Sequence, residues 1–242
     1  MITVTPTPRR VGVLIYGDLE DLHSLDDAIG NVLGDEASPG SEYEMPALQI
    51  LAISYELRQA WLGQRQATFV GNGMSPAVQQ ALKKIGPAHN VYFQIRIAIP
   101  EILFDVMALG DFIEIHSRKA RLPALDRDIL IVQLFQAEVT AALQSLLFPA
   151  AAARLAELIY GTVPRFRNYY THYVEMLNGR FMQLTPEKRV QQILPLARRI
   201  SERGSDYLRF ARNLEESAEE LDCLPEDLET VSGSTALSAE EW

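Results

Sequence analysis

Cysteine is almost absent from this 242-residue sequence, which contains Cys223 alone. A single cysteine cannot form an intrachain disulfide and cannot supply the thiolates of a cysteine-based zinc site. A disulfide-stabilised secreted fold is therefore excluded, and we expect a cytoplasmic protein in a reducing compartment.

Long hydrophobic runs are lacking as well. No stretch of about 18 or more uncharged apolar residues occurs, and the longest candidate, 139–153, contains Pro149. The first ten residues are polar and include Arg9 and Arg10, without the apolar segment of a signal peptide. We expect neither a membrane span nor a secretory signal.

The common catalytic and cofactor patterns are also missing. The four histidines are widely scattered, with no pair at the i, i+4 spacing of a helical metal site. No G-x-S-x-G elbow is present, and the glycines of 71–73 lack the remainder of a nucleotide-binding fingerprint. The sequence therefore argues against an enzyme, and we expect no cofactor.

Charge is distributed unevenly along the chain, whose formal net charge is −10. Residues 1–160 carry a net charge of −6, residues 161–212 carry +6, and residues 213–242 carry −10 without any basic residue. The acidic end is either a solvated mobile tail or a segment that screens the basic one. We expect a mobile acidic tail over 223–242.

The first 120 residues mix strand and helix patterns. Strands are predicted at 11–16, 66–70 and 91–99, and the odd-numbered residues of 91–99 are all large and apolar. One polar face is typical of an antiparallel sheet. Helices are predicted at 19–33, from a capping box at Ser41 and Glu44 to residue 62, at 75–84 and at 100–118. We expect an α+β unit over 1–120 with a mainly antiparallel sheet of about three strands.

From residue 126 onward the pattern is helical throughout. Residues 126–148 are apolar on more than one face, which is typical of a buried helix. Further helices are predicted over 150–160, 164–178 and from 185 onward. The predicted fold class is therefore α+β followed by an all-helical C-terminal half, with a helical bundle over 121–222 packed on the first unit.

A heptad pattern runs through 195–221, where apolar residues recur at alternating steps of three and four. One position is always small and the other always large (Ala197, Gly204, Ala211 and Ala218 against Ile200, Tyr207, Leu214 and Leu221). The wide apolar face of 196–210 favours packing on 126–148. The narrower end predicts interface residues for another chain at Leu214, Ala218 and Leu221.

Two further groups of residues have alternative interpretations. Basic and aromatic residues between 165 and 203 have the chemistry of single-stranded nucleic-acid binding, or form a helix with buried aromatics and outward arginines. The candidate contacts are Arg165, Arg167, Tyr169, Tyr170, Arg198 and Arg199. The carboxylates Asp18, Asp21 and Asp26 after the first strand could hold Mg²⁺, but helix capping by Asp18 and Asp21 is the preferred interpretation.

Two stretches resemble a known family. They are LAISYELRQAWLGQRQATFVGNGM (51–74) and NVYFQIRIAIPEILFDVMALGDFI (90–113). Together they are similar to a family of uncharacterised bacterial proteins with a small α+β domain. The resemblance covers residues 11–115 and implies the α+β fold, without implying an activity or site residues.

These observations favour a non-catalytic interaction or assembly protein that associates with itself through a helix, as a homo-oligomer or as a subunit of a larger assembly. One alternative is a nucleic-acid-binding or regulatory module that uses 165–203. Another is a Mg²⁺-dependent hydrolase-like enzyme that uses the acids of 18–27.

Overall fold

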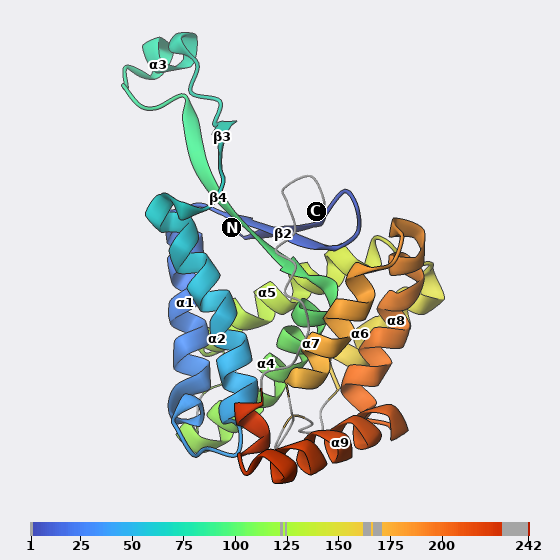
Figure 1. Cartoon of the computed structure of the whole chain (residues 1–242). Helices are drawn as coiled ribbons and strands as arrows, with labels where there is room; N and C mark the ends of the chain where they lie inside the picture. The colour runs from blue at the N-terminus through green and yellow to red at the C-terminus, as the bar shows by residue number, and fades with distance from the viewer. Residues whose placement is uncertain (1, 122, 124, 162–165, 167–170, 229–241) are drawn as a thin grey trace.

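The computed structural model describes residues 2–121, 123, 125–161, 166, 171–228 and 242. Four strands and nine α-helices occur within these residues, and the predicted α+β class is confirmed. Figure 1 shows a helical body with the sheet at one end and a strand pair that projects away from it.

The sheet has four antiparallel strands in the order β1-β2-β4-β3. They are β1 (Thr3–Pro6), β2 (Gly12–Gly17), β3 (Ala67–Gly71) and β4 (His89–Ala98). The antiparallel arrangement is confirmed, whereas the expected number of about three strands was too low. The missed strand, β1, is only four residues long, and such a short strand at a sheet edge carries little sequence signal.

Helix α4 (Ile99–Ala120) begins directly after β4 and occupies the centre of the body. Pro100 lies in its first turn, where a missing backbone N–H costs no hydrogen bond. Almost its entire first three turns are buried, and α1, α2, α5, α6, α7 and α8 all contact it. The expectation that 126–148 forms a helix buried on more than one face is wrong. Helix α5 (Arg127–Gln144) is buried on one side, against α1, α6 and β1, and leaves Leu130 and Leu134 exposed.

Helices α1 (Leu19–Leu33) and α2 (Glu44–Gln59) pack against each other and against α4. The predicted cap of α1 is confirmed, because the Asp18 carboxylate accepts a hydrogen bond from the Asp21 backbone N–H at 2.9 Å, and Gly34 ends the helix with a positive φ of 49°. A short 3₁₀ helix, η1 (Gly34–Ala37), follows α1, and a π-turn, η2 (Ala60–Gln64), ends α2.

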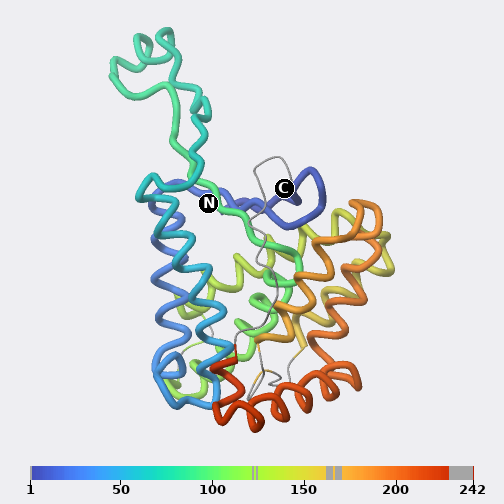
Figure 2. Tube along the Cα trace, viewed as in Figure 1, coloured from blue at the N-terminus to red at the C-terminus, as the bar shows by residue number. Residues whose placement is uncertain are grey.

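The C-terminal half contains α6 (Pro149–Ile159), α7 (His172–Met182), α8 (Pro186–Glu202) and α9 (Ser205–Leu221), followed by the 3₁₀ turn η3 (Pro225–Asp227). The helix expected over 164–178 lies partly outside the described residues. Its described part, α7, continues past Gly179 to Met182. Helix α3 (Pro76–Leu82) belongs to the first half and lies at the tip of the projecting strand pair (Figure 2).

The expectation that the heptad pattern of 195–221 follows one helix is wrong. Arg203 adopts a left-handed conformation (φ 43°) and Gly204 caps the next helix, so the pattern is divided between α8 and α9. Helix α8 packs on α4 and α6, where 126–148 was expected as its neighbour. A heptad spacing therefore arose from two separate helices that each bury one face.

One hydrophobic core runs through the body, from Ile2 in the first half to Tyr207 in α9. Helix α4 from the first half contacts α7 and α8 from the second, and α1 contacts α5. The division into units 1–120, 121–222 and 223–242 stays a prediction. None of the described helices combines the length and the apolar character needed to cross a membrane.

Gly12 provides a test of the β2–β4 pairing. A Cβ built at Gly12 would lie 2.0 Å from the Ile97 carbonyl oxygen, so Gly12→Ala must displace backbone. We expect a loss of about 2 kcal/mol in the free energy of unfolding, measured by urea denaturation. The control is Gly30→Ala in α1, where no atom lies within 4 Å of a new Cβ. This control should be neutral or stabilising by up to about 1 kcal/mol, and equal losses in both variants would contradict the close strand approach.

Candidate functional site

One element of the fold projects away from the hydrophobic core. We call it the arm and define it as residues 66–94. It contains β3, α3 and the first part of β4, and it projects from the body as a twisted strand pair with α3 at its tip (Figures 1 and 2). Every residue of β3 is exposed, and α3 has no buried residue. Within the arm, only Phe93, at its base, packs against the hydrophobic core of the chain.

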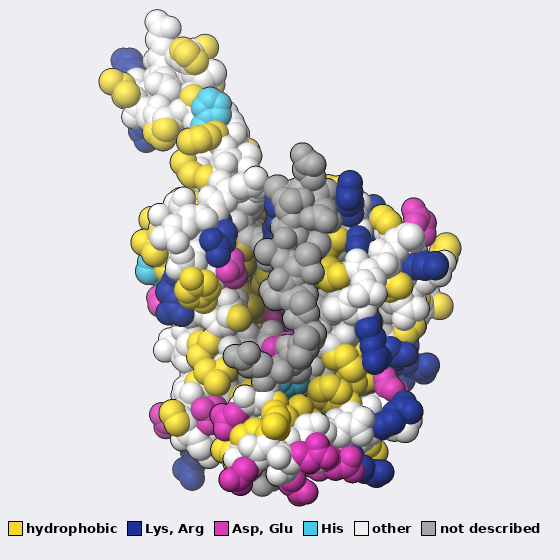
Figure 3. Space-filling view, in the orientation of Figure 1, with side chains coloured by type: hydrophobic (Ala, Val, Ile, Leu, Met, Phe, Trp, Pro, Cys, Tyr) yellow, Lys and Arg dark blue, Asp and Glu magenta, His cyan; other side chains and the backbone are white. Residues whose placement is uncertain are grey.

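Large apolar side chains are exposed along the arm. Phe69 is 71% exposed and Ile85 is fully exposed. The others are Val70, Val78, Leu82 and Val91. In the space-filling view, apolar atoms appear on the projecting strand pair and around its tip (Figure 3). A group of exposed apolar side chains on one projecting element is typical of a contact surface for another molecule.

The tip of the arm is held together by its own hydrogen bonds. Ser75 caps α3 by accepting a bond from the Val78 backbone N–H. The Gln79 side chain donates to the carbonyl oxygens of Met74 (3.0 Å) and Gly86 (2.9 Å). Asn72 donates to the carbonyl oxygen of Pro87 at 3.0 Å, which closes the loop on the other side of α3. The exposed side chains are thus presented from a preorganised loop, which lowers the entropy lost on binding.

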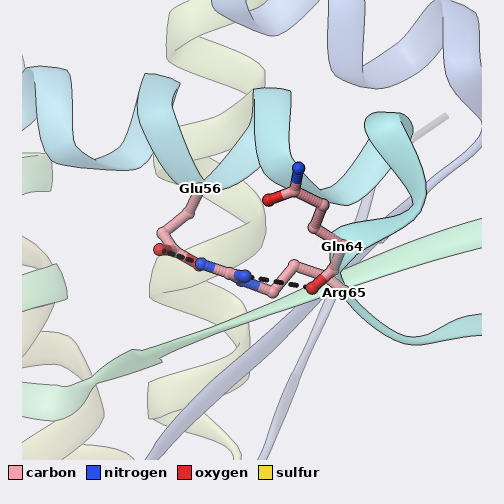
Figure 4. A network of polar contacts seen from close by, with 3 residues as sticks. All are labelled: Glu56, Gln64 and Arg65. Atoms are coloured by element: carbon pink, nitrogen blue, oxygen red, sulfur yellow. Dashed lines mark hydrogen bonds and ion pairs between the residues drawn. The ribbon is translucent and has the colours of Figure 1, made fainter.

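The base of the arm is fixed to α2 by an arginine–carboxylate pair (Figure 4). Arg65 Nε and Nη2 donate to the two carboxylate oxygens of Glu56 at 2.7 and 2.8 Å, and Nη1 donates to the Gln64 carbonyl oxygen at 3.0 Å. Gly63 has φ 79°, a conformation that favours glycine, and it turns the chain from the π-turn into β3. Such a bidentate pair restrains the direction of the chain as it leaves α2.

A second set of bonds joins the two strands at the same level. Gln66 Oε1 accepts from Arg96 Nη2 at 2.9 Å and from the Gln94 side chain. The Gln66 carbonyl oxygen also accepts from the Gln94 backbone N–H at 3.0 Å. Beside this junction, the rings of His23 and Trp61 stack with centroids 4.4 Å apart. The arm is therefore anchored at its base and ordered at its tip.

Sequence reasoning missed the arm, although a charge signal marks it. Residues 57–100 contain five basic residues and neither Asp nor Glu. Because the whole chain has a net charge of −10, the remaining residues sum to −15. Within the arm itself, the charged residues are Lys83 and Lys84 at the tip, with His89 nearby in the sequence. A long stretch without carboxylates in an acidic protein was the signal to find.

A second unusual feature is a pair of buried acids on α4. Glu101 and Asp105 lie one helical turn apart, and Asp105 is 1% exposed, with no hydrogen-bond partner for Oδ1 among the described residues. Glu101 accepts a hydrogen bond from the Asn178 side chain of α7, and Glu175 of α7 lies near enough to repel it. Buried carboxyls that lie close to other carboxylates are costly when charged.

Burial raises the pKa of Glu101 to about 7, although a hydrogen bond from the Ala98 backbone opposes this and the Glu175 charge adds to it. Burial and the Glu101 charge raise the pKa of Asp105 well above its usual range. The neutral form of Asp105 is therefore favoured, while Glu101 changes charge near neutral pH. Within the described residues, no group of three or more His, Cys, Asp or Glu side chains is arranged to hold a metal ion.

The acids considered for Mg²⁺ have structural partners. Asp18 and Asp21 each accept a hydrogen bond from the other's backbone N–H, at 2.9 and 3.2 Å, which is a capping box. Asp26 lies 4.0 Å from Arg58 of α2. The preferred interpretation of Asp18 and Asp21, helix capping, is what the structure shows.

The nucleic-acid candidates are only partly described. Arg165, Arg167, Tyr169 and Tyr170 lie outside the described residues. Arg198 and Arg199 are exposed on α8, and Arg198 lies 3.9 Å from Glu202. The described aromatic residues nearby are buried and unavailable for base stacking, since Phe166 packs on Phe104, and Tyr173 packs on Tyr207 and Phe210.

The predicted interface residues of α9 have different surroundings. Leu214 and Ala218 are buried within the chain, whereas Leu221 is 68% exposed at the end of the helix. Leu224, three residues further on, is 64% exposed. An interface role for this region stays a prediction, and its accessible apolar residues are Leu221 and Leu224.

Removal of the arginine at the base of the arm should loosen it. We expect Arg65→Ala to increase amide hydrogen exchange in β3 and in residues 89–94 by about three- to tenfold, because the two bonds to Glu56 hold the strand exit. The free energy of unfolding should fall by about 1 kcal/mol or less, since the pair is partly exposed. Arg118→Ala, which removes a solvent-exposed pair on α4, is the control. Equal exchange in both variants would show that the clamp does not orient the arm.

The buried acids should make stability depend on pH. Between its usual pKa of 4.5 and about 7, Glu101 binds more protons in the folded than in the unfolded chain. The free energy of unfolding therefore falls as pH rises through this window. Glu101→Gln should remove the part of this decline that Glu101 contributes, leaving the part due to Asp105, and stabilise the protein above pH 7 by up to about 3 kcal/mol.

The measurement is urea denaturation at several pH values from 5 to 8. Glu114→Gln, at a partly exposed position of the same helix, should change the free energy of unfolding by about 0.5 kcal/mol or less. If the parent protein shows the same pH dependence as Glu101→Gln, the carboxyl is not a source of it.

Comparison with known proteins places the chain in a family. No curated protein and no solved structure matches it. A family model does match, over residues 2–235, and this match includes the helical half that lies beyond the resemblance at 11–115. Because it covers nearly the whole chain, the protein belongs to the family described as Domain of unknown function (DUF6904).

Proposed function

We propose that the protein is a non-catalytic assembly protein that associates with itself through the arm, inside the cytoplasm. The single observation that carries this proposal is the arm itself: a projecting element held by its own hydrogen bonds, with six large apolar side chains exposed beyond Phe93 at its base. The single cysteine is consistent with a reducing compartment.

The energetics of the arm support a binding role. An isolated two-stranded hairpin is marginally stable in water, and exposed apolar side chains such as Phe69 and Ile85 do not contribute to folding. If each of the six large apolar side chains of the arm were covered, burial would contribute about 1.5–3 kcal/mol per side chain before the cost of association. A contact with another molecule accounts for apolar groups at these positions.

The two other candidate functions have less support. The nucleic-acid alternative relies on 165–203, where Phe166 and Tyr173 are buried in the core. The Mg²⁺-dependent alternative relies on acids that cap α1 or lie beside Arg58. No described contact favours either alternative over assembly.

Replacement of apolar residues on the arm tests the proposal. We expect Phe69→Ser combined with Ile85→Ser to weaken self-association by about 100-fold or more, because two exposed anchors are lost and the fold is not. The measurement is molar mass by light scattering, together with sedimentation equilibrium over a concentration series.

Phe148→Ser is the matched control, because Phe148 is 86% exposed on the body, away from the arm. Circular dichroism should show unchanged helix content in all variants. A parent protein that stays monomeric up to millimolar concentration would refute self-association, and an equal effect of Phe148→Ser would refute the assignment to the arm.

A further inference from the structure

We propose that the tip of the arm binds the C-terminal end of α9 on a second copy of the chain, which produces a head-to-tail assembly. This inference rests on the proposed function and deepens it by naming the partner surface. The two contact surfaces are the arm tip, defined as residues 82–85, and the α9 end, defined as residues 219–224.

The two surfaces have the same backbone construction. Each begins with the last leucine of a helix, Leu82 in α3 and Leu221 in α9. Each continues with a charged residue in the left-handed conformation, Lys83 at φ 54° and Asp222 at φ 53°. The next backbone N–H then bonds to the carbonyl oxygen five residues earlier at 3.1 Å in both cases, from Lys84 to Gln79 and from Cys223 to Ala218.

The apolar residues of the two surfaces are matched as well. The third residue after each leucine is apolar and exposed, and it is Ile85 in the arm tip and Leu224 in the α9 end. All four side chains are more than half exposed. Each surface thus offers two large apolar side chains at the same spacing beside one helix end, which suits mutual burial.

The charges of the two surfaces are opposite. Lys83 and Lys84 lie between the apolar residues of the arm tip, and residues 57–100 contain no carboxylate to neutralise them. Glu219, Glu220 and Asp222 surround Leu221 and are exposed, and residues 213–242 contain no basic residue. Lysines that face glutamates across an apolar contact select the correct orientation and accelerate encounter.

The end of α9 carries an electrostatic cost in the isolated chain. The C-terminus of a helix has a partial negative charge and favours cations, yet the last turn of α9 contains Glu219 and Glu220 and no basic residue. Each unfavourable placement lowers the stability of this helix end. Lysines brought by a second molecule would relieve this repulsion, which gives the acidic end a reason to bind the arm tip.

Geometry requires that the contact joins two molecules. Helix α3 and helix α9 lie at opposite ends of the chain, separated by the length of the body (Figure 1). Acidic side chains gather at the α9 end in the space-filling view, and basic ones are visible at the arm tip (Figure 3). Two different surfaces at opposite ends form a heterologous contact, which closes into a ring or extends as a filament.

Charge reversal on each surface tests the inference. Lys83→Glu with Lys84→Glu makes the arm tip acidic like the α9 end, and Glu219→Lys with Glu220→Lys gives residues 219–224 a net charge of +1, the same sign as the arm tip. We expect each variant alone to associate more than about tenfold more weakly than the parent, because like charges then meet. An equimolar mixture should assemble again, since opposite charges are restored at every contact.

The readouts are light scattering and sedimentation at about 50 mM salt and at about 500 mM salt, where parent assembly should weaken because exposed charges are screened. Arg127→Glu with Lys188→Glu, two exposed positions on the body, reproduces the net charge change of the arm variant and should assemble as the parent does.

Loss in both single variants and recovery in the mixture would establish the contact. A different result would be assembly that persists in the α9 variant but is lost in Phe69→Ser with Ile85→Ser. This result would overturn the α9 surface and leave the proposed function standing, as expected if two arms paired with each other. A parent that does not associate under any condition would overturn both.

Discussion

The direct junction between β4 and α4 is the constraint on which the rest of the structure depends. The strand ends at Ala98 and the helix begins at Ile99, so one continuous segment runs from the arm to the centre of the body. The buried end of β4 pairs with β2 and fixes the start of α4, against which six other helices pack. Because no loop separates them, the direction of the arm is tied to the orientation of the core helix.

The arm and the body divide the chain by physical role. The body buries most of its large apolar side chains around α4 and leaves others such as Phe148 exposed, whereas the arm leaves six exposed, Phe69 and Ile85 among them. Hydrogen bonds at the tip and the Glu56–Arg65 pair at the base keep the arm ordered without a core of its own. Order without burial is what an element needs if it is to bind another molecule with little loss of entropy.

The surface charge also differs between the arm and the opposite end of the body. Carboxylates are absent from 57–100 and abundant after residue 213, so the two ends of the molecule differ in sign. Inside the body, burial raises the pKa of Glu101 to about 7 and that of Asp105 well above its usual range, because burial disfavours the charged forms. Protonation lowers the cost of burying carboxyl groups in the core. On the surface, the arm tip is basic and the α9 end is acidic.

Local signals in the sequence determined much of the fold. Alternating residues defined β4, Asp18 and Gly34 delimited α1, and one polar sheet face indicated antiparallel pairing. The fold class followed from these signals because capping and periodicity act within a few residues. Three features were decided only by the tertiary structure. They are the central position of α4, the division of 195–221 into two helices at Arg203, and the projection of 66–94 from the body. Those outcomes depend on contacts between distant segments: a strand pattern shows which face can be buried, but whether another element covers that face depends on where the rest of the chain packs.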